Sequence, residues 1–307
     1  MLRDSAGNLY GTASAAQSGM VYRVDPSGHE KVLYSFGGGA DGADPAGGHI
    51  ADESGNLFGT TRGGVNCTED QSGCGVVFEL AASGAYTVPY TSAGGSDGQW
   101  PTGNLARDSA GNLYGTTQSG GGSGQCYAGC GTVFEISANG VESILYAFTG
   151  ESDGGEPQAG VTLGAGGVLY GTTSIAGEGI EGTVFMVKGS TESVVFGFPE
   201  GTDGSQPQAG VVLDSSGKLY GATVRGGALN EGAIYEENEA GQETLLYSFP
   251  SADYVGEPGG PPTGGVVLDA AGNLYGTAGD SYEHDLGWLY KIDPSGSESV
   301  LYTFTDR

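Results

Sequence analysis

Short apolar runs, separated by glycine, proline and aspartate, follow one another along the whole chain. The clearest stretch places four such runs in succession, at Val211–Leu213, Leu219–Thr223, Ala233–Glu236 and Thr244–Phe249. No window has the length and period of an amphipathic helix, whereas short runs bounded by turn residues are typical of strands. The pattern therefore predicts four antiparallel strands, named A to D in this subsection, joined by hairpins.

This four-strand pattern recurs six times. The string Leu-Tyr/Phe-Gly-Thr/Ala marks strand B of every unit, with spacings of 48 to 56 residues, at Leu9, Leu57, Leu113, Leu169, Leu219 and Leu274. A period of roughly fifty residues with strand content indicates a repeat architecture. Six units of four strands predict an all-β fold, a six-bladed β-propeller with four antiparallel strands per blade. A linear β-solenoid fits less well, because its coils are shorter and lack strict hairpin turns.

The repeat leaves no stretch for a second domain. We expect one domain over residues 1–307, with blades at approximately 1–36, 45–92, 101–148, 157–198, 207–249 and 262–304. Met1–Asp4 run directly into a repeat, without the Pro-x-Ala/Gly-Gly/Asn that comes before the matching residues of later units. Because no signal peptide is present, we expect an export signal upstream of this chain.

The links between strands fall into two kinds. Strands A and B are joined by a short Asp-x-x-Gly-Asn/Lys turn, as at Asp108–Asn112, and strands C and D by one such as Asp25–Gly28. The B–C and D–A links are long and irregular. Alternating strand direction places the short turns on one face and the variable loops on the other, and variable loops on a regular scaffold usually carry function.

A glycine also recurs in the middle of strand B. In a strand it costs up to roughly 1 kcal/mol relative to alanine. We therefore expect an aromatic ring of the neighbouring blade to approach it closely, such as Phe78, Phe134 or Phe185.

Composition narrows the class of partner. The chain has 37 acidic and 10 basic residues, a net charge of −27, and 62 glycines at turn and strand positions. Clustered Lys and Arg are absent, so we expect no nucleic-acid partner. No apolar run is long enough for a transmembrane helix. The acidity fits an exported protein or one that attracts cations, and we expect a monomer.

The repeat motifs themselves resemble a known family. Gly111–Thr117 reads G-N-L-Y-G-T-T and Gly131–Ile136 reads G-T-V-F-E-I. Together with the later L-Y-S-F, D-G and P-x-A-G strings, they resemble the GloVer tandem repeat of bacterial surface proteins, over essentially the whole chain. More distantly, the unit is similar to NHL-type propellers. The resemblance implies a secreted or cell-surface protein, and it implies neither a catalytic activity nor site residues.

All four cysteines lie in two B–C loops, at Cys67, Cys74, Cys126 and Cys130. Three pairings are possible, and the simplest closes each loop on itself. We predict these two local disulfides, which require an oxidising compartment. A zinc site shared by the four thiolates is the alternative, since the spacing of Cys126 and Cys130 suits a metal.

Aspartates recur before glycine in the D–A loops, at Asp41, Asp97, Asp153 and Asp203. These loops lead into the innermost strands, so we expect the carboxylates at the mouth of the central channel. Hard cations such as Ca²⁺ bind oxygen ligands of this kind. The alternative is an Asp-Gly turn that repeats because the unit repeats.

Several residues break the repeat. His49 replaces an apolar residue near an innermost strand, Arg62 opens a B–C loop, and Tyr282 and His284 lie in a B–C loop of the last blade. In a closed propeller the last blade adjoins the first, so we expect these groups on one rim. A histidine base with an arginine that neutralises a carboxylate suits proton abstraction from a uronate. The alternative is that His49 only packs in its strand.

Aromatic residues of the variable loops, and two arginines that break the repeat, are candidate ligand contacts. Aromatic rings stack on sugars, and we select Trp100, Tyr127, Tyr254, Arg107 and Arg225. We predict an extracellular propeller that binds a glycan on its variable face. The alternatives are a polysaccharide-acting enzyme, either a uronate lyase or a glycoside hydrolase, and a cell-surface protein–protein scaffold.

Overall fold

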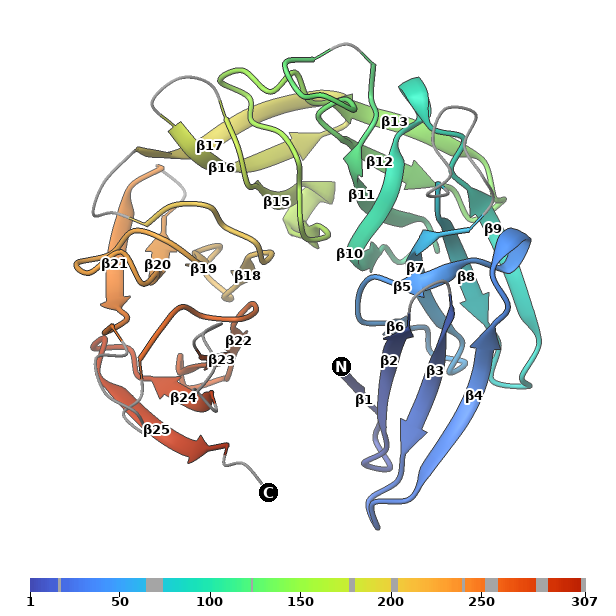
Figure 1. Cartoon of the computed structure of the whole chain (residues 1–307), viewed down its shortest axis with the longest axis horizontal. Helices are drawn as coiled ribbons and strands as arrows, with labels where there is room; N and C mark the ends of the chain where they lie inside the picture. Colours follow the sequence, from blue (N-terminus) through green and yellow to red (C-terminus); the bar gives the residue numbers. More distant parts are fainter. Residues whose placement is uncertain are drawn as a thin grey trace. The chain divides into compact units, whose positions relative to one another are not determined.

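The computed structural model describes most of the chain and contains six antiparallel sheets (Figure 1). The described residues are 1–15, 18–64, 74–122, 124–176, 180–199, 204–238, 241–251, 259–279 and 287–304. Each sheet has four strands paired in chain order, except that the first strand of the second sheet is split in two. The fold is therefore a six-bladed β-propeller, as predicted. Within the described ranges the helical segments are 3-10 turns, at Gly39–Asp41, Gly95–Asp97 and Ala165–Gly167.

The first three blades lie in chain order between residues 2 and 147. Blade 1 consists of β1 (Leu2–Arg3), β2 (Leu9–Ala15), β3 (Ser18–Val24) and β4 (Glu30–Phe36). Blade 2 consists of β5 (Ala43–Pro45), β6 (Ile50–Ala51), β7 (Leu57–Gly63), β8 (Val76–Leu80) and β9 (Tyr86–Thr91). Blade 3 consists of β10 (Gln99–Arg107), β11 (Leu113–Ser119), β12 (Thr132–Ile136) and β13 (Glu142–Ala147).

The last three blades repeat the same order of strands. Blade 4 consists of β14 (Thr162–Leu163), β15 (Leu169–Thr173), β16 (Ile180–Lys188) and β17 (Thr191–Pro199). Blade 5 consists of β18 (Val212–Leu213), β19 (Leu219–Thr223), β20 (Ala233–Glu237) and β21 (Glu243–Ser248). Blade 6 consists of β22 (Val267–Leu268), β23 (Leu274–Ala278), β24 (Trp288–Ile292) and β25 (Glu298–Thr303). The strands of blade 5 match the runs predicted from sequence to within one residue at each end.

Two compact units divide the chain. The first comprises Met1–Thr149, Ala159–Leu163 and Gly189–Thr191, and the second comprises Gly150–Gln158, Gly164–Lys188 and Glu192–Arg307. Blades 1 to 3 belong to the first unit, and blades 5 and 6 with most of blade 4 belong to the second. The assignment of all six blades to one domain stays a prediction.

The glycine in the second strand of each blade faces an aromatic ring of its own blade. Gly59 of β7 pairs with Phe78 of β8, and a Cβ at Gly59 would lie 2.6 Å from the Phe78 ring. Gly115 has the same relation to Phe134. The expectation that the ring comes from the neighbouring blade was therefore wrong. The cross-strand register brings the ring over the glycine, because both residues point to the same face of the sheet.

Consecutive blades within a unit are joined by apolar rings and by a recurrent threonine. Phe36 of blade 1 packs edge-on against the buried Phe78 of blade 2, with ring centroids 5.3 Å apart. In the second unit Phe249 packs in the same way on Tyr290, at 5.2 Å. The hydroxyl of Thr60 donates to the carbonyl of Gly103 in the next blade, at 3.2 Å. The threonine of the repeated string thus ties one blade to the next.

A proline also connects blades. A Cβ at Gly75, just before β8, would lie 2.7 Å from Cδ of Pro101 in blade 3, and the φ of Gly75 is +81°. Gly75 therefore has both a conformation and a neighbour that disfavour a side chain. The same arrangement joins Gly182 to Pro207 in the second unit.

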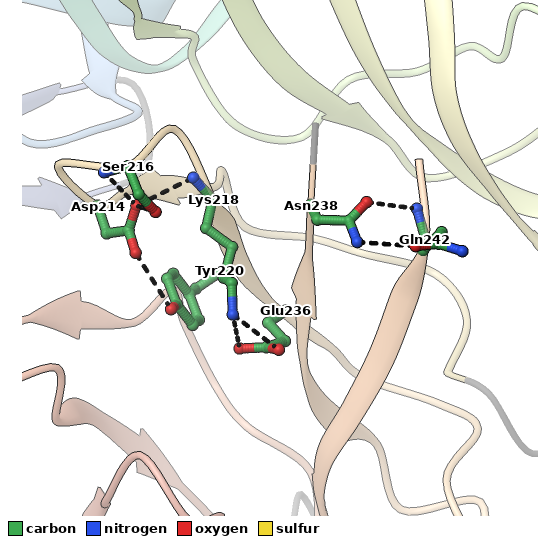
Figure 2. Close-up of polar contacts among 7 residues, drawn as sticks. All are labelled: Asp214, Ser216, Lys218, Tyr220, Glu236, Asn238 and Gln242. Atoms are coloured by element: carbon green, nitrogen blue, oxygen red, sulfur yellow. Dashed lines mark hydrogen bonds and ion pairs between the residues drawn. The ribbon is translucent and has the colours of Figure 1, made fainter. Parts of the chain in front are cut away.

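The short turns between the first two strands are built by an aspartate. In blade 3 the Asp108 carboxylate accepts hydrogen bonds from the backbone and side chain of Asn112 and from the Tyr114 hydroxyl, at 2.9, 2.9 and 3.0 Å. In blade 5 Asp214 accepts from Ser216, Lys218 and Tyr220 (Figure 2). At Asp269, in the corresponding turn of blade 6, hydrogen bonds led by the Asn273 side chain lower the pKa to about 2. This carboxylate is therefore ionised at neutral pH and serves as a turn acceptor.

Candidate functional site

Each blade has two ends that differ in the length of their links. The short-turn end carries the links between first and second strands and between third and fourth strands. The long-loop end carries the link between second and third strands and the link to the next blade. Strand alternation within each sheet separates the two ends as predicted.

At the long-loop end of blades 2 and 3, three side chains form a polar and aromatic cluster. The Arg62 guanidinium, at the end of β7, lies over the Trp100 ring with its carbon 5.8 Å from the centroid. It also donates a hydrogen bond to the side-chain oxygen of Gln118 in β11. All three side chains are half-buried. The structure therefore brings together Arg62 and Trp100, which the sequence analysis selected separately.

The backbone holds Trp100 in an uncommon conformation. Its φ is +59°, which non-glycine residues seldom adopt. Its N–H donates to the carbonyl of Cys74 in blade 2, at 3.2 Å, and the adjacent Pro101 ring seats on Gly75. These contacts between blades hold a conformation that would otherwise relax, and such residues concentrate at functional sites.

The same conformation recurs before proline in other blades. Asp44, Glu156 and Gln206 also precede proline and have φ values of +53°, +51° and +54°. Gln206 donates its N–H to Glu181, at 2.7 Å, as Trp100 does to Cys74. The scaffold therefore presents a different side chain at an identical backbone position in four blades. In blade 3 that side chain is an aromatic ring.

A disulfide braces the loop beside this cluster. Cys126 and Cys130 are bonded, with their Cα atoms 5.2 Å apart, as predicted. The bond excludes these two thiolates as ligands of the alternative zinc site. Cys74 is disulfide-bonded as well, while Cys67 lies outside the described residues. Tyr127, within the braced loop, is fully exposed.

This arrangement suits a sugar more than an apolar ligand. The face of the Trp100 ring opposite Arg62 can pack on the C–H groups of a pyranose, and the arginine and the amide can hydrogen bond to hydroxyl or carboxylate groups. The hydrogen bond with Gln118 restricts the Arg62 side chain. Fewer side-chain conformations are therefore lost when a ligand binds. A braced loop with an exposed tyrosine adds a second ring nearby in sequence. The cluster is thus a candidate binding site.

The contacts of His49 are with residues outside this cluster. The side chain is 5% exposed, and its ring stands edge-on to Phe78 at a centroid distance of 5.9 Å. Burial lowers the pKa of His49, an effect that the backbone of Gly11 partly opposes. The imidazole is therefore neutral and enclosed. Its contacts are with Phe78 and Gly11, whereas those of Arg62 are with Gln118 and Trp100, so these two members of the predicted acid–base set have different partners.

Asp41, the first of the recurrent loop aspartates, lies beside fourth strands. The Asp41 carboxylate accepts hydrogen bonds from the N–H of Gly37 and the hydroxyl of Tyr34, at 2.7 and 3.0 Å. Its carbonyl accepts from Tyr86 of β9, at 2.5 Å. Tyr34 and Tyr86 belong to β4 and β9, the fourth strands of their blades, and not to the first strands expected at a channel mouth. Asp41 therefore serves a turn in this structure.

Asp97 and Asp153 lie close to glutamates of fourth strands. Asp97 accepts a hydrogen bond from the N–H of Ala93, at 2.6 Å. Burial, and then Asp97, raise the pKa of Glu142 to about 7. Burial, and then Asp153, do the same to Glu192. Among the residues that the structure describes, no group of three or more His, Cys, Asp or Glu side chains is arranged to hold a metal ion.

The remaining candidates are dispersed. Arg107 lies at the end of β10 beside the Asp108 turn, with its guanidinium 5.7 Å from the centroid of the Phe58 ring, so it lies at the short-turn end. Arg225 is exposed and its backbone bridges to Ser205 at the long-loop end of blade 5. Tyr254, Tyr282, His284, Asp203 and Cys67 lie outside the described residues.

Sequence reasoning missed Gln118 and the shared backbone position of Trp100. Gln118 occupies in blade 3 the position that Arg62 occupies in blade 2, directly after the repeated Leu-Tyr-Gly-Thr-Thr. In blade 1 the matching Ser14 hydrogen bonds to the pre-proline Asp44 of blade 2. The two variable positions of the unit therefore meet across the blade boundary. A search for variable positions within the aligned repeat would have found this pair.

Comparison with known proteins locates the chain by family and by fold. The model of the Gloeobacter/Verrucomicrobia repeat family matches residues 1–185 and 123–307. No protein of curated function matches this chain in sequence. No helix of the described residues is long and apolar enough to cross a membrane.

Solved structures with a similar fold are distant in sequence. The periplasmic gluconolactonase of Pseudomonas aeruginosa is 16% identical, with a TM-score of 0.53 over 97% of this chain and 82% of that one. A luciferin-regenerating enzyme is 13% identical, with a TM-score of 0.50 over 99% and 91%. Puromycin hydrolase is 11% identical, with a TM-score of 0.50 over 97% of this chain and 52% of its own. At these identities the likeness shows the fold alone.

Proposed function

This chain belongs to the Gloeobacter/Verrucomicrobia repeat family, and from that premise we propose that it is an exported propeller that binds a glycan at the Arg62–Trp100–Gln118 cluster. The observation that carries the proposal is the Arg62 guanidinium seated over the Trp100 ring while hydrogen bonded to Gln118. One aromatic face and two hydrogen-bonding groups are what a sugar ring requires.

The backbone supports the same conclusion. Trp100 is held at positive φ by contacts with blade 2, although the position accepts Asp, Glu or Gln in other blades. A large ring is therefore not required by the scaffold at this position. A ring that packing does not require, beside a cation, favours ligand recognition over structure.

Export is supported by the disulfide between Cys126 and Cys130. Disulfides persist in oxidising compartments and are rare in the cytosol of mesophiles. The bond also restrains the loop that carries Tyr127, which limits the entropy lost when a ligand orders that loop.

The test is a glycan array, followed by titration of the bound glycan into the full chain and two variants. We expect Trp100→Ala to weaken binding at least tenfold, which is about 1.4 kcal/mol. Gln206→Ala is the matched control, because it places alanine on the same strained backbone in blade 5. It should bind like the parent. An array without any bound glycan, or equal affinity of Trp100→Ala and the parent, would reject the proposal.

The uronate-lyase hypothesis stays a prediction with a separate readout. Incubation of the full chain with a panel of uronic-acid polysaccharides would produce unsaturated products that absorb in the ultraviolet. If such product forms, His49→Ala should abolish it at temperatures where circular dichroism shows that the variant is still folded, because His49 is buried and its truncation also lowers stability. Product formed equally well by His49→Ala would remove His49 from the mechanism.

A further inference from the structure

A groove of about 330 Å³ lies at the short-turn end between blades 1 and 2. One side is formed by Tyr10, Arg23 and Lys31 with the apolar Val32 and Leu33 of β4. The other side is formed by Gly55, Leu57 and Leu80, and by the turn Ala81–Gly84 between β8 and β9. Its volume lies within the range of small-ligand sites. The glycan proposal does not use this groove.

The groove is basic in a strongly acidic protein. Arg23 and Lys31 are two of the 10 basic residues in a chain of net charge −27, and they are cross-strand partners in β3 and β4. The Nε atom of Arg23 is buried and has no hydrogen-bond partner within the described part of the chain. The guanidinium is therefore partly withdrawn from water, and an anion in the groove would balance its charge.

The repeat contains the same groove without the charges. Between blades 4 and 5 a groove of about 320 Å³ is lined by Tyr170, Met186, Val194, Val195, Gly217, Leu219, Asn238 and Gly241. Register shows the equivalence, since Tyr10 pairs with Arg23 and Tyr170 pairs with Met186. At the place of Lys31, after the shared glutamate, the sequence of blade 4 has Ser193. The scaffold therefore forms this groove without needing Arg23 or Lys31.

Two carboxylates balance part of the positive charge. Asp4 accepts a hydrogen bond from the Tyr10 hydroxyl at 3.1 Å, and Asp25 lies near enough to Arg23 for its pKa to be lowered in part by that charge, after the backbone hydrogen bond from His29. Asp25 is further held by the backbone of Ser27, at 2.8 Å. Both carboxylates are thus engaged outside the groove lining, and neither lines the groove itself.

We propose that this groove binds an organic carboxylate with an apolar body of about the size of benzoate. The carboxylate accepts hydrogen bonds from the terminal amino groups of the Arg23 guanidinium and from the Lys31 ammonium. The apolar body packs along Val32, Leu33 and Leu57. Val32 is 45% exposed without a ligand, so apolar surface remains to be covered.

The test uses calorimetric titration of the full chain with benzoate, inorganic phosphate and benzyl alcohol. We expect benzoate to bind with one site per chain, Arg23→Met to weaken it at least tenfold, and Lys31→Ser to weaken it several-fold. Both substitutions copy blade 4, so they preserve the fold. We expect phosphate to bind more weakly than benzoate and benzyl alcohol not to bind measurably.

A transplant gives the converse measurement. Met186→Arg combined with Ser193→Lys should create a second benzoate site, which doubles the stoichiometry. No benzoate binding to the parent, equal binding by Arg23→Met, or phosphate bound as tightly as benzoate would each overturn the proposal. Gln206→Ala is the control and should bind benzoate like the parent. Failure of glycan binding at Trp100 leaves these results unchanged, so the two proposals fail independently.

Discussion

Blades 3 and 5 share the register of their second and third strands, and at one core position blade 5 has a carboxyl where blade 3 has an apolar side chain. In blade 3 Leu113 pairs with Ile136, and in blade 5 Leu219 pairs with Glu237. Ile136 is 1% exposed and belongs to an apolar cluster with Leu105 and Phe134. Glu237 is 0% exposed, and neither of its carboxylate oxygens has a hydrogen-bond partner within the described residues. The second and third strands therefore pair in the same register whether this position holds isoleucine or glutamate.

The difference shows how the scaffold accommodates a misplaced polar group. Burial, and then the charge of Glu243, raise the pKa of Glu237 to about 7. A carboxyl with such a pKa is largely protonated below neutral pH, so the cost of burying a charge is avoided there. Cross-strand pairs with both neighbouring strands hold β20 in place, and the Glu237 carboxyl stays protonated there.

The turns of the two blades differ in the same way. In blade 3 Asn112 donates to Asp108 and accepts a hydrogen bond from the N–H of Ala138, at 3.0 Å. In blade 5 Lys218 takes that position and forms an ion pair with Glu236, at 3.0 Å (Figure 2). In blade 3 the asparagine side chain connects two turns, whereas in blade 5 two partly exposed side chains form an ion pair. Ion pairs of this kind contribute little to stability.

The largest effect is expected when the carboxyl that blade 5 carries at Glu237 is placed at the matching position of blade 3. Ile136→Glu should lower the free energy of unfolding by about 3 kcal/mol or more at pH 7, because it removes the apolar contacts of Ile136 and buries a carboxyl within an apolar cluster. Urea unfolding followed by circular dichroism measures the change.

Ile136→Val is the matched control for this experiment. It removes one methylene and should cost about 1 kcal/mol. A loss for Ile136→Glu no larger than that of the control would show that the core of blade 3 tolerates a carboxyl as blade 5 does.

The second effect is a dependence on pH that belongs to blade 5. In the unfolded chain Glu237 loses its proton near its ordinary pKa of about 4.5, whereas in the folded chain it keeps the proton up to a pKa of about 7. Its contribution to stability is thus present below about pH 4.5 and is lost as the pH rises to about 7. Relative to Glu237→Gln, the parent should lose about 2–3 kcal/mol over that interval.

Urea unfolding of both proteins at several pH values measures this difference. Glu237→Gln keeps the shape of the side chain and does not titrate, so the difference cancels the effects of the other carboxyls. Glu192→Gln is a useful second variant, because burial also raises the pKa of Glu192 to about 7. A parent-minus-variant difference that stays constant with pH would show that Glu237 has an ordinary pKa.

The smallest effect concerns the turn. Lys218→Asn restores the asparagine of blade 3 and removes the ion pair with Glu236, so the two changes nearly cancel. We expect the free energy of unfolding to change by less than about 1 kcal/mol. Thermal unfolding at low and high salt checks this, because the ion pair is screened and the restored hydrogen bonds are not. A loss well above that size would mean that the pair stabilises blade 5 as strongly as a buried contact.

Much of the fold could be predicted from the sequence because its information is local. The strand β19 (Leu219–Thr223) has the predicted bounds, and the Cys126–Cys130 disulfide joins residues only a few positions apart. The partner of Gly59 could not be placed in the right blade, because an alternating pattern says which face a ring occupies and not which blade supplies it. The prediction that the ring over Gly59 comes from the neighbouring blade was wrong for this reason.

The sequence by itself determined the strands, their turns and their sixfold repetition, because hydrophobic alternation and glycine-aspartate turns act over a few residues. Only the tertiary structure decided which variable side chains meet. Arg62 and Trp100 lie in different blades, and the Pro101 ring on Gly75 brings them together. Burial, likewise, is a property of the packed blade: it enclosed His49 and raised the pKa of Glu237, whereas neither effect is written in the neighbouring residues of the chain.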